Sequence, residues 1–218
     1  SCNNERVLQL PEIENAEIRE VLDVSPAYIF YDETQPDSTL LNRKNLIGTT
    51  NWLVNIDKRL TLKQAMPHIK FLQDKKRNAE VHINENAKNY FTCNDTSIKN
   101  LGFVEFTNTD FNFGSSYDHN KKISMLESKF TLIIKIESSS KIMLLPTYRF
   151  SETTKTNLND LRNDLQEIVN TNNILEEKIK LILNISNLVS FQDYISIKSK
   201  LLKLESDKII IDANEFIY

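Results

Sequence analysis

Glycine is scarce in this chain, which has 218 residues but only Gly48, Gly102 and Gly114. Loops that cradle phosphate groups need several glycines close together, because the backbone must approach the phosphate and adopt positive φ angles. Neither the G-x-G-x-x-G pattern of dinucleotide-binding folds nor the G-x-x-x-x-G-K pattern of P-loops occurs. The motifs of these two classes of nucleotide-binding protein are therefore excluded.

Side chains that commonly bind metals are few and lie far apart along the chain: His68, His82, His119, Cys2 and Cys93. No pair has the spacing of metal ligands, so we expect no metal site and no cofactor. A net charge of −3 gives no electrostatic reason to expect a nucleic-acid partner. Catalytic histidines need positioned partners, and Asp118-His119 would require folding to bring a nucleophile close. We therefore predict a protein without enzymatic activity.

Long apolar runs are also missing, since the longest nearly apolar stretch covers residues 179–185. A helix that spans a bilayer needs about 20 such residues. The chain begins Ser1-Cys2-Asn3-Asn4-Glu5, which resembles the cleavage site of a bacterial lipoprotein. The resemblance implies acyl chains on Cys2, a short polar tether, and attachment to the outer membrane on its periplasmic side. The alternatives are an incidental cysteine or, in an exported protein, a Cys2–Cys93 disulfide.

The hydrophobic pattern predicts an α+β protein with two sheet–helix halves. The expected parts are an N-terminal tether and lead-in (1–24), a first half (25–120) and a second half (121–218). Residues 11–24 fit either a helix or an extended lead-in. In the first half we expect strands, one helix containing Pro67, and polar loops with short structure over 84–100. The expected strands are 27–31, 39–46, 51–57, 101–106 and 111–113, and the expected helix is 61–75.

The second half has a more regular pattern. It predicts a hairpin, two amphipathic helices and two further strands: strands 129–137 and 141–145, helix 157–170, strand 178–185, helix 191–204 and strand 208–212. Ser190 is well placed as the N-cap of the last helix.

The two halves share a pattern when the chain is shifted by 129 residues. Residues 53–56 then fall on 182–185, residues 60–62 on 189–191, and residues 80–83 on 209–212. This alignment needs no gap, and it raises the hypothesis of a degenerate tandem repeat of a β-β-α-β-α-β unit. A chance match between two strand–loop–helix–strand units is the alternative.

The order expected over residues 129–212 resembles the periplasmic domain of the ExbD/TolR family. The segments that carry the resemblance are Lys141-Ile142-Met143-Leu144, residues 159–165 and residues 190–197. It implies the fold and a role as an envelope adaptor. The transmembrane helix and membrane aspartate of that family have no counterpart here, so the resemblance does not extend to motor function.

Two sites are candidates for binding. A small mixed sheet leaves an edge strand unpaired, and Ile209, Ile210 and Ile211 in the closing strand would add a partner strand there. Three consecutive isoleucines also fit a central strand that is covered on both faces. Asp57-Lys58-Arg59 follows a buried strand and precedes a helix, where open α/β sheets bind ligands, although such charges are more often a solvated turn.

We therefore expect an adaptor that binds an envelope protein or peptidoglycan, or a second copy of itself. The alternatives are an exported hydrolase with an unrecognised site and an unanchored regulatory module.

Overall fold

The computed structural model describes residues 7–81, 83–114, 130–147, 152–171 and 178–218. The chain forms two compact units. Unit 1 is Ser1–Asn108 together with Ser190–Ile195, and unit 2 is Thr109–Val189 together with Ser196–Tyr218. Each unit contains one mixed β-sheet and helical segments, which confirms the α+β class with two sheet–helix halves.

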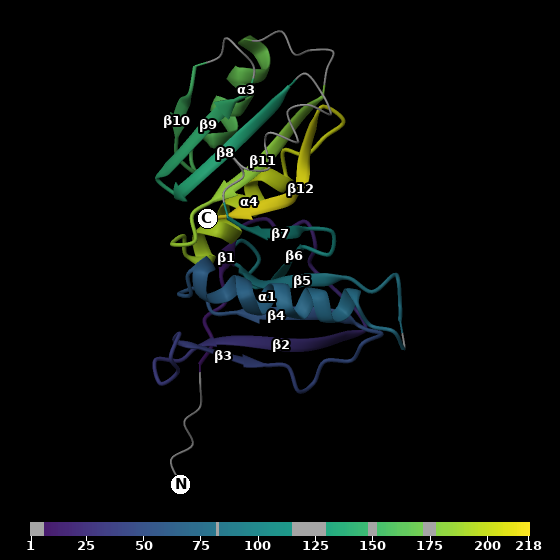
Figure 1. The fold of residues 1–218 in the computed structure, drawn as a ribbon. Coiled ribbons are helices and arrows are strands. Elements are labelled where there is room, and N and C mark those ends of the chain that lie inside the picture. The colour runs from purple at the N-terminus through teal and green to yellow at the C-terminus, as the bar shows by residue number, and fades with distance from the viewer. Residues whose placement is uncertain (1–6, 82, 115–129, 148–151, 172–177) are drawn as a thin grey trace. The chain divides into compact units, whose positions relative to one another are not determined.

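Unit 1 is built on the strand order β1-β5-β4-β2-β3, with β6 also pairing with β5. Its elements are β1 (Glu12–Ile13), β2 (Val24–Tyr31), β3 (Thr39–Asn42), β4 (Asn51–Ile56), α1 (Leu62–Arg77), β5 (Asn89–Asp95) and β6 (Asn100–Glu105). Strands β1, β2, β4 and β5 are parallel to their neighbours in this group, whereas β3 and β6 are antiparallel. Figure 1 shows α1 lying across one face of this sheet.

Helix α1 forms because an apolar stripe recurs at helical spacing behind a defined start. Leu62, Met66, Ile69 and Leu72 are all buried. At the start, the Thr61 N–H donates to Gln64 Oε1 at 2.9 Å, one half of a capping box. Strands β2 and β4 alternate between buried and half-buried residues, as expected for a sheet that a helix covers on one face.

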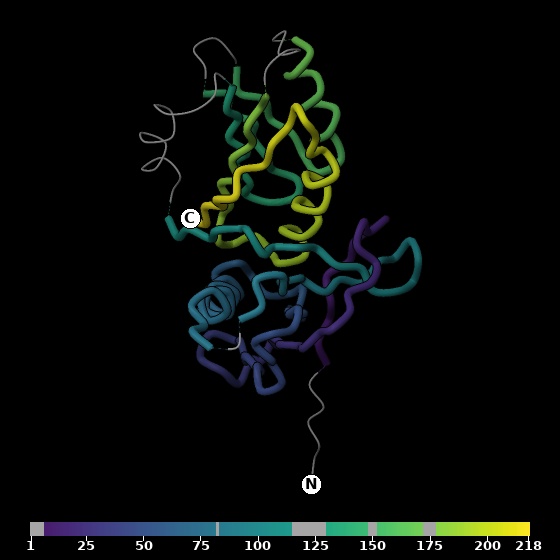
Figure 2. Tube along the Cα trace, turned by 90° about the vertical axis from the view of Figure 1, so that its right-hand side faces the viewer, coloured from purple at the N-terminus to yellow at the C-terminus, as the bar shows by residue number. Residues whose placement is uncertain are grey.

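Unit 2 has the strand order β10-β9-β8-β11-β12-β7. Its elements are β7 (Asp110–Phe113), β8 (Thr131–Ser138), β9 (Lys141–Pro146), β10 (Thr154–Thr156), α3 (Leu161–Thr171), β11 (Ile179–Ile185), α4 (Phe191–Leu202) and β12 (Ile209–Ile217). The first residues of α4 group with unit 1. Figure 2 shows α3 and α4 on the same side of the strands of this sheet. As predicted, Ser190 caps α4, since its hydroxyl accepts the Asp193 N–H at 3.1 Å.

The two sheets share one topology. The orders β3-β2-β4-β5 and β9-β8-β11-β12 correspond strand for strand, with the first pair antiparallel and the next two pairs parallel. The loops after β4 and β11 also match at the offset of 129 residues. Asp57 N–H donates to Ile29 O at 3.0 Å, and Ser186 N–H donates to Ile136 O at 2.8 Å.

The correspondence has two limits. Helix α3 has no counterpart in unit 1, where residues 43–50 between β3 and β4 form turns. The offset also changes after the helix, because β5 begins at Asn89 and β12 at Ile209, which are 120 residues apart. Residues 80, 81 and 83, which were aligned with residues of β12, lie outside the strands.

Several expected boundaries differ from the structure. The region 84–100, expected to be loops with short structure, contains the seven-residue strand β5 (Asn89–Asp95), and all but one of its residues are buried. This strand has polar residues at both ends of a short apolar centre, so its sequence lacks the alternation of apolar and polar residues that indicates a strand. The expected boundary at residue 120 lies beyond the observed division at 108, because β7 pairs with β12. The lead-in is extended, with β1 joining the sheet of unit 1.

Candidate functional site

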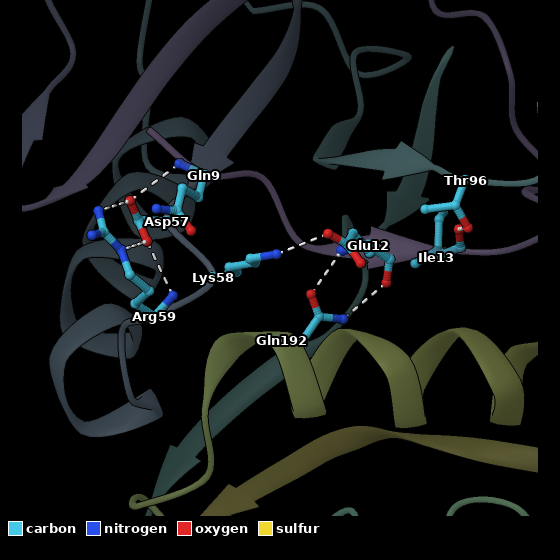
Figure 3. Close-up of polar contacts among 8 residues, drawn as sticks. All are labelled: Gln9, Glu12, Ile13, Asp57, Lys58, Arg59, Thr96 and Gln192. Atoms are coloured by element: carbon cyan, nitrogen blue, oxygen red, sulfur yellow. Dashed lines mark hydrogen bonds and ion pairs between the residues drawn. The ribbon is translucent and has the colours of Figure 1, made fainter. Parts of the chain in front are cut away.

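The loop between β4 and α1 carries a fully buried carboxylate, Asp57, whose exposed fraction is 0%. Its two oxygens accept a fork of hydrogen bonds from Arg59, with Nε at 2.9 Å and Nη2 at 2.8 Å. The backbone N–H of Arg59 donates to Oδ1 at 3.0 Å, and the Gln9 N–H donates to Oδ2 at 3.1 Å. Figure 3 shows this arrangement at the start of the described chain. Asp57 therefore holds both its own loop and the N-terminal segment.

These contacts set the charge state of the pair. Burial raises the pKa of Asp57, but the hydrogen bonds from Arg59 and from the backbone outweigh it, so this pKa lies below its ordinary value. The hydrogen bond to Asp57 raises the pKa of Arg59 in turn. The guanidinium also lies 4.7 Å from the centre of the Tyr31 ring, a cation–π contact. These contacts thus favour the ionised form of Asp57, with Arg59 as its partner.

Lys58 and Gln192 hold the next part of the N-terminal segment (Figure 3). The Lys58 N–H donates to Gln9 O at 2.8 Å, and its ammonium group lies 2.8 Å from Glu12 Oε1. The side-chain amide of Gln192 accepts the Glu12 N–H at 2.8 Å and donates to the Glu12 carbonyl at 2.9 Å. This amide pairs with the backbone of Glu12 as a neighbouring strand would.

A second fully buried carboxylate, Asp95, ends β5 and performs the same task. Its oxygens accept backbone N–H groups from Asn15 at 3.2 Å and Ala16 at 2.8 Å. The Ser97 hydroxyl and N–H donate to Oδ1 at 2.6 and 3.0 Å. The Ser97 hydroxyl and these backbone groups hold the pKa of Asp95 at about 2 against the opposing effect of burial. Nearby, Thr96 donates its N–H to Ile13 O at 3.0 Å, as the contact in Figure 3 indicates.

Gly102 allows the N-terminal segment to lie this close to the sheet. A Cβ atom at position 102 would lie 2.5 Å from the Cβ of Ala16 and 3.1 Å from Ile13 Cδ1. Such distances are far below van der Waals contact, so no other residue fits without displacement. Farther along, the Phe103 N–H donates to Ile18 O at 2.9 Å.

We name Asp57, Lys58, Asp95 and Gln192 the N-terminal clamp. Asp57, Lys58 and Asp95 lie at the carboxyl ends of β4 and β5, the edge where open α/β sheets bind ligands, and Gln192 lies in the first turn of α4. In this protein the groups at that edge bind the chain's own N-terminal segment. Among the described residues, no three His, Cys, Asp or Glu side chains are placed to hold a metal ion. The contacts described here attach the N-terminal segment to unit 1 through two buried carboxylates, a lysine and a side-chain amide.

The structure locates the other residues that the sequence singled out. Cys2, the predicted lipid attachment site, lies outside the described residues, as do His82 and Asp118-His119. Cys93 is a free, fully buried thiol, and burial raises its pKa. His68 on α1 forms a hydrogen bond to Thr39 on β3, with its Nε2 atom 2.9 Å from the Thr39 hydroxyl.

The proposed binding strand Ile209–Ile211 opens β12 and pairs with β11 on one side. Within the described ranges, β7 pairs with β12 only from Asn214 to Ile217, so no strand covers the other side of Ile209–Ile211. Ile210 has an exposed fraction of 36%, and its two neighbours are half-buried.

Two features shorten this open edge. Ser206 donates its N–H to Ile209 O at 2.9 Å, and its hydroxyl accepts the Ile209 N–H at 3.2 Å. The register then slips, because Leu181 pairs with Ile211 and Leu183 with Glu215, which makes β12 bulge. Bulges and turns of this kind discourage unwanted strand pairing. The open part of the edge is therefore centred on Ile211.

Sequence reasoning missed a buried ion pair in unit 2. Lys198 on α4 and Glu215 on β12 have exposed fractions of 5% and 1%, and the ammonium group contacts Glu215 Oε1. Lys198 also donates to the Thr109 hydroxyl at 3.3 Å. Lysine at position 198 was a detectable signal, because it falls on the apolar face of α4, four residues after Tyr194 and three before Leu201.

No family model, curated protein or solved structure matches this chain. None of the helices in the described ranges is long and apolar enough to cross a membrane.

Proposed function

We propose that this protein is a non-enzymatic lipoprotein of a Gram-negative envelope, anchored through Cys2 to the outer membrane on its periplasmic side. It holds a protein partner or peptidoglycan near that membrane. The N-terminal clamp is the observation that supports this proposal most strongly. An anchored module must transfer load from its anchor to its fold, and the clamp holds the segment from Gln9 onward, seven residues after Cys2.

The clamp suits this role because two of its acceptors, Asp57 and Asp95, are buried carboxylates. Hydrogen bonds to an ionised group are roughly twice as strong as those between neutral groups. Asp57 and Asp95 each bind backbone N–H groups of the N-terminal segment, at Gln9 and at Asn15 and Ala16. The segment is thereby held at two points along its length.

The edge of β12 around Ile211 is the proposed partner site. Its main-chain groups would pair with a partner strand, and the exposed Ile210 side chain would add specificity. We retain the adaptor role that the ExbD/TolR resemblance implies as part of the proposal, although unit 2 has an additional strand, β10, between β9 and α3.

Two experiments test the proposal separately. With the native leader present, Cys2→Ser should move the protein from the membrane fraction to the soluble periplasm, and incorporation of labelled palmitate should be lost. Continued membrane fractionation of the variant would refute the anchor.

For the partner site, a photo-reactive amino acid at Ile210 should crosslink to an envelope protein or to peptidoglycan fragments. The matched control places the same group at the exposed Lys155 in β10. Equal crosslinking at both positions, or none at Ile210, would contradict binding along β12.

A further inference from the structure

Helix α1 carries a strongly basic face in a chain whose net charge is −3. Along the helix, every fourth residue from Lys63 to Lys75 is exposed: Lys63, Pro67, Phe71 and Lys75. Residues four apart form a continuous ridge on a helix. Arg43, from the turn after β3, places its guanidinium 5.2 Å from the centre of the Phe71 ring, and Lys44 follows it. We name Arg43, Lys44, Lys63, Phe71 and Lys75 the basic face.

Several basic side chains elsewhere in the molecule, unlike the cations of this face, are paired with carboxylates. Lys58, Lys88, Lys135, Lys180 and Lys198 all lie within ion-pair distance of a carboxylate. No acidic side chain in the described ranges pairs in this way with Arg43, Lys44, Lys63 or Lys75. Lys76 on the same helix is half-buried and donates to Thr50 O and Lys88 O, so it faces the sheet. The basic face therefore concentrates uncompensated positive charge.

The basic face also contains an exposed aromatic ring, that of Phe71. Phe71 has an exposed fraction of 47%, although the apolar stripe of α1 is otherwise buried. A phenyl ring beside a guanidinium suits the boundary between lipid headgroups and acyl chains, because interfacial helices combine basic side chains with Phe, Trp or Leu side chains that enter the membrane. Basic side chains are attracted to the negative surface potential of anionic lipids.

We propose that the basic face of α1 rests on an anionic phospholipid surface, with Phe71 entering the headgroup region. A polyanion without an apolar layer would satisfy the cations but leave Phe71 in water. The lipid surface alone accounts for both kinds of side chain.

A lipid anchor at Cys2 would allow the basic face to reach the membrane. This point, unlike the others, rests on the proposed function. Seven residues from Cys2 to Gln9 span at most about 25 Å. Gln9 is hydrogen-bonded to Lys58, a few residues before α1 begins, and α1 with its 16 residues is about 24 Å long. The basic face thus lies within reach of a membrane that holds Cys2.

The test is cosedimentation of the purified, unacylated full chain with two kinds of vesicle. Vesicles of mixed phosphatidylglycerol and phosphatidylcholine should bind the protein, and binding should fall as salt is raised. Vesicles of phosphatidylcholine alone should bind it at least about tenfold more weakly.

The double variant Arg43→Glu/Lys75→Glu should lose most of the binding to anionic vesicles. Its matched control, Lys155→Glu/Lys178→Glu, reverses two exposed lysines of unit 2 and should bind as the unchanged protein does. Phe71→Ser keeps every charge and should weaken binding by a smaller factor. Circular dichroism of each variant verifies folding.

Equal binding to both vesicle types, equal losses in the variant and its control, or no sedimentation with either vesicle would overturn the proposal. Because the chain in this assay is unacylated, these outcomes concern the basic face, whereas fractionation of Cys2→Ser concerns the anchor.

Discussion

The two units stabilise their buried carboxylates in different ways. Each unit buries carboxylates near the strands of its sheet. In unit 1, Asp57 and Asp95 are satisfied largely by backbone N–H groups and by short-range partners in their own loops. In unit 2, Glu215 contacts a buried ammonium group from a helix, that of Lys198.

This difference determines what each carboxylate does for the fold. A carboxylate that binds backbone amides fixes the path of the chain, and in unit 1 that chain is the N-terminal segment. A buried ion pair between two elements fixes how those elements pack, and its loss leaves a buried charge without its partner. The shared topology therefore supports two kinds of polar site, one that attaches a segment and one that locks a helix to a strand.

The largest effect should come from breaking the ion pair of unit 2. Lys198→Ala leaves Glu215 buried without the ammonium group, which typically costs about 3–5 kcal/mol of unfolding free energy. Urea denaturation followed by circular dichroism measures this loss.

The control is the double variant Lys198→Met/Glu215→Leu, which removes both charges and should recover most of the stability. A double variant as unstable as the single one would show that packing, and not the unpaired charge, causes the loss.

Next in size is the effect of adding a methyl group beneath the N-terminal segment. Gly102→Ala would place a Cβ atom 2.5 Å from the Cβ of Ala16, and overpacking of this kind costs about 1–3 kcal/mol. Denaturant titration should show the loss. Ala16→Gly removes the opposing Cβ atom, so the combined variant should be more stable than Gly102→Ala alone. Absence of this rescue would contradict the close approach.

Acid should weaken the N-terminal clamp through Asp95. The pKa of Asp95 in the folded protein is about 2, below the ordinary value of 3.8. The stabilisation is therefore complete above about pH 4 and is lost as the pH falls toward 2. Asp95→Asn should flatten the pH dependence of stability in this window, as measured by urea titrations at several pH values. An unchanged slope would mean that Asp95 is not the group responsible.

The smallest effect should come from the half-exposed pair of Lys58 and Glu12. Exposed ion pairs contribute about 0–1 kcal/mol, so Glu12→Gln should change the unfolding free energy only slightly. The backbone bonds of Glu12 to Gln192 remain in this variant. A loss comparable to that of Gly102→Ala would show that the charge, and not the backbone, holds this part of the clamp.

The sequence was most informative where local pattern and tertiary packing agree. The helices α1 and α4, the hairpin of β8 and β9 and the strand β11 follow from apolar periodicity, and Ser190 follows from its position before Phe191. The sequence did not predict strand β5, because its polar residues, such as Asn89 and Asp95, are buried by contacts with distant parts of the chain. A local hydrophobic pattern does not contain this information.

The candidate site was only half visible in the sequence. Asp57-Lys58-Arg59 was noted because it follows a strand, but its partners lie far away in sequence. Gln9 is 48 residues from Asp57, and Gln192 is 180 residues from Glu12. A local sequence pattern cannot predict contacts between residues so far apart in the chain. Gly102 offered a hint, since a glycine within a strand often marks the close approach of another backbone.

The central claim is that two buried carboxylates attach the N-terminal segment to unit 1. Amide hydrogen exchange, resolved by residue with NMR, tests it most directly in the unchanged chain and in Asp57→Ala and Asp95→Asn variants. We predict that the Gln9, Asn15 and Ala16 amides are protected in the unchanged chain. Protection of Gln9 should be lost in the first variant and that of Asn15 and Ala16 in the second, while β8 and β11 keep theirs. Rapid exchange of these three amides in the unchanged chain would contradict the account.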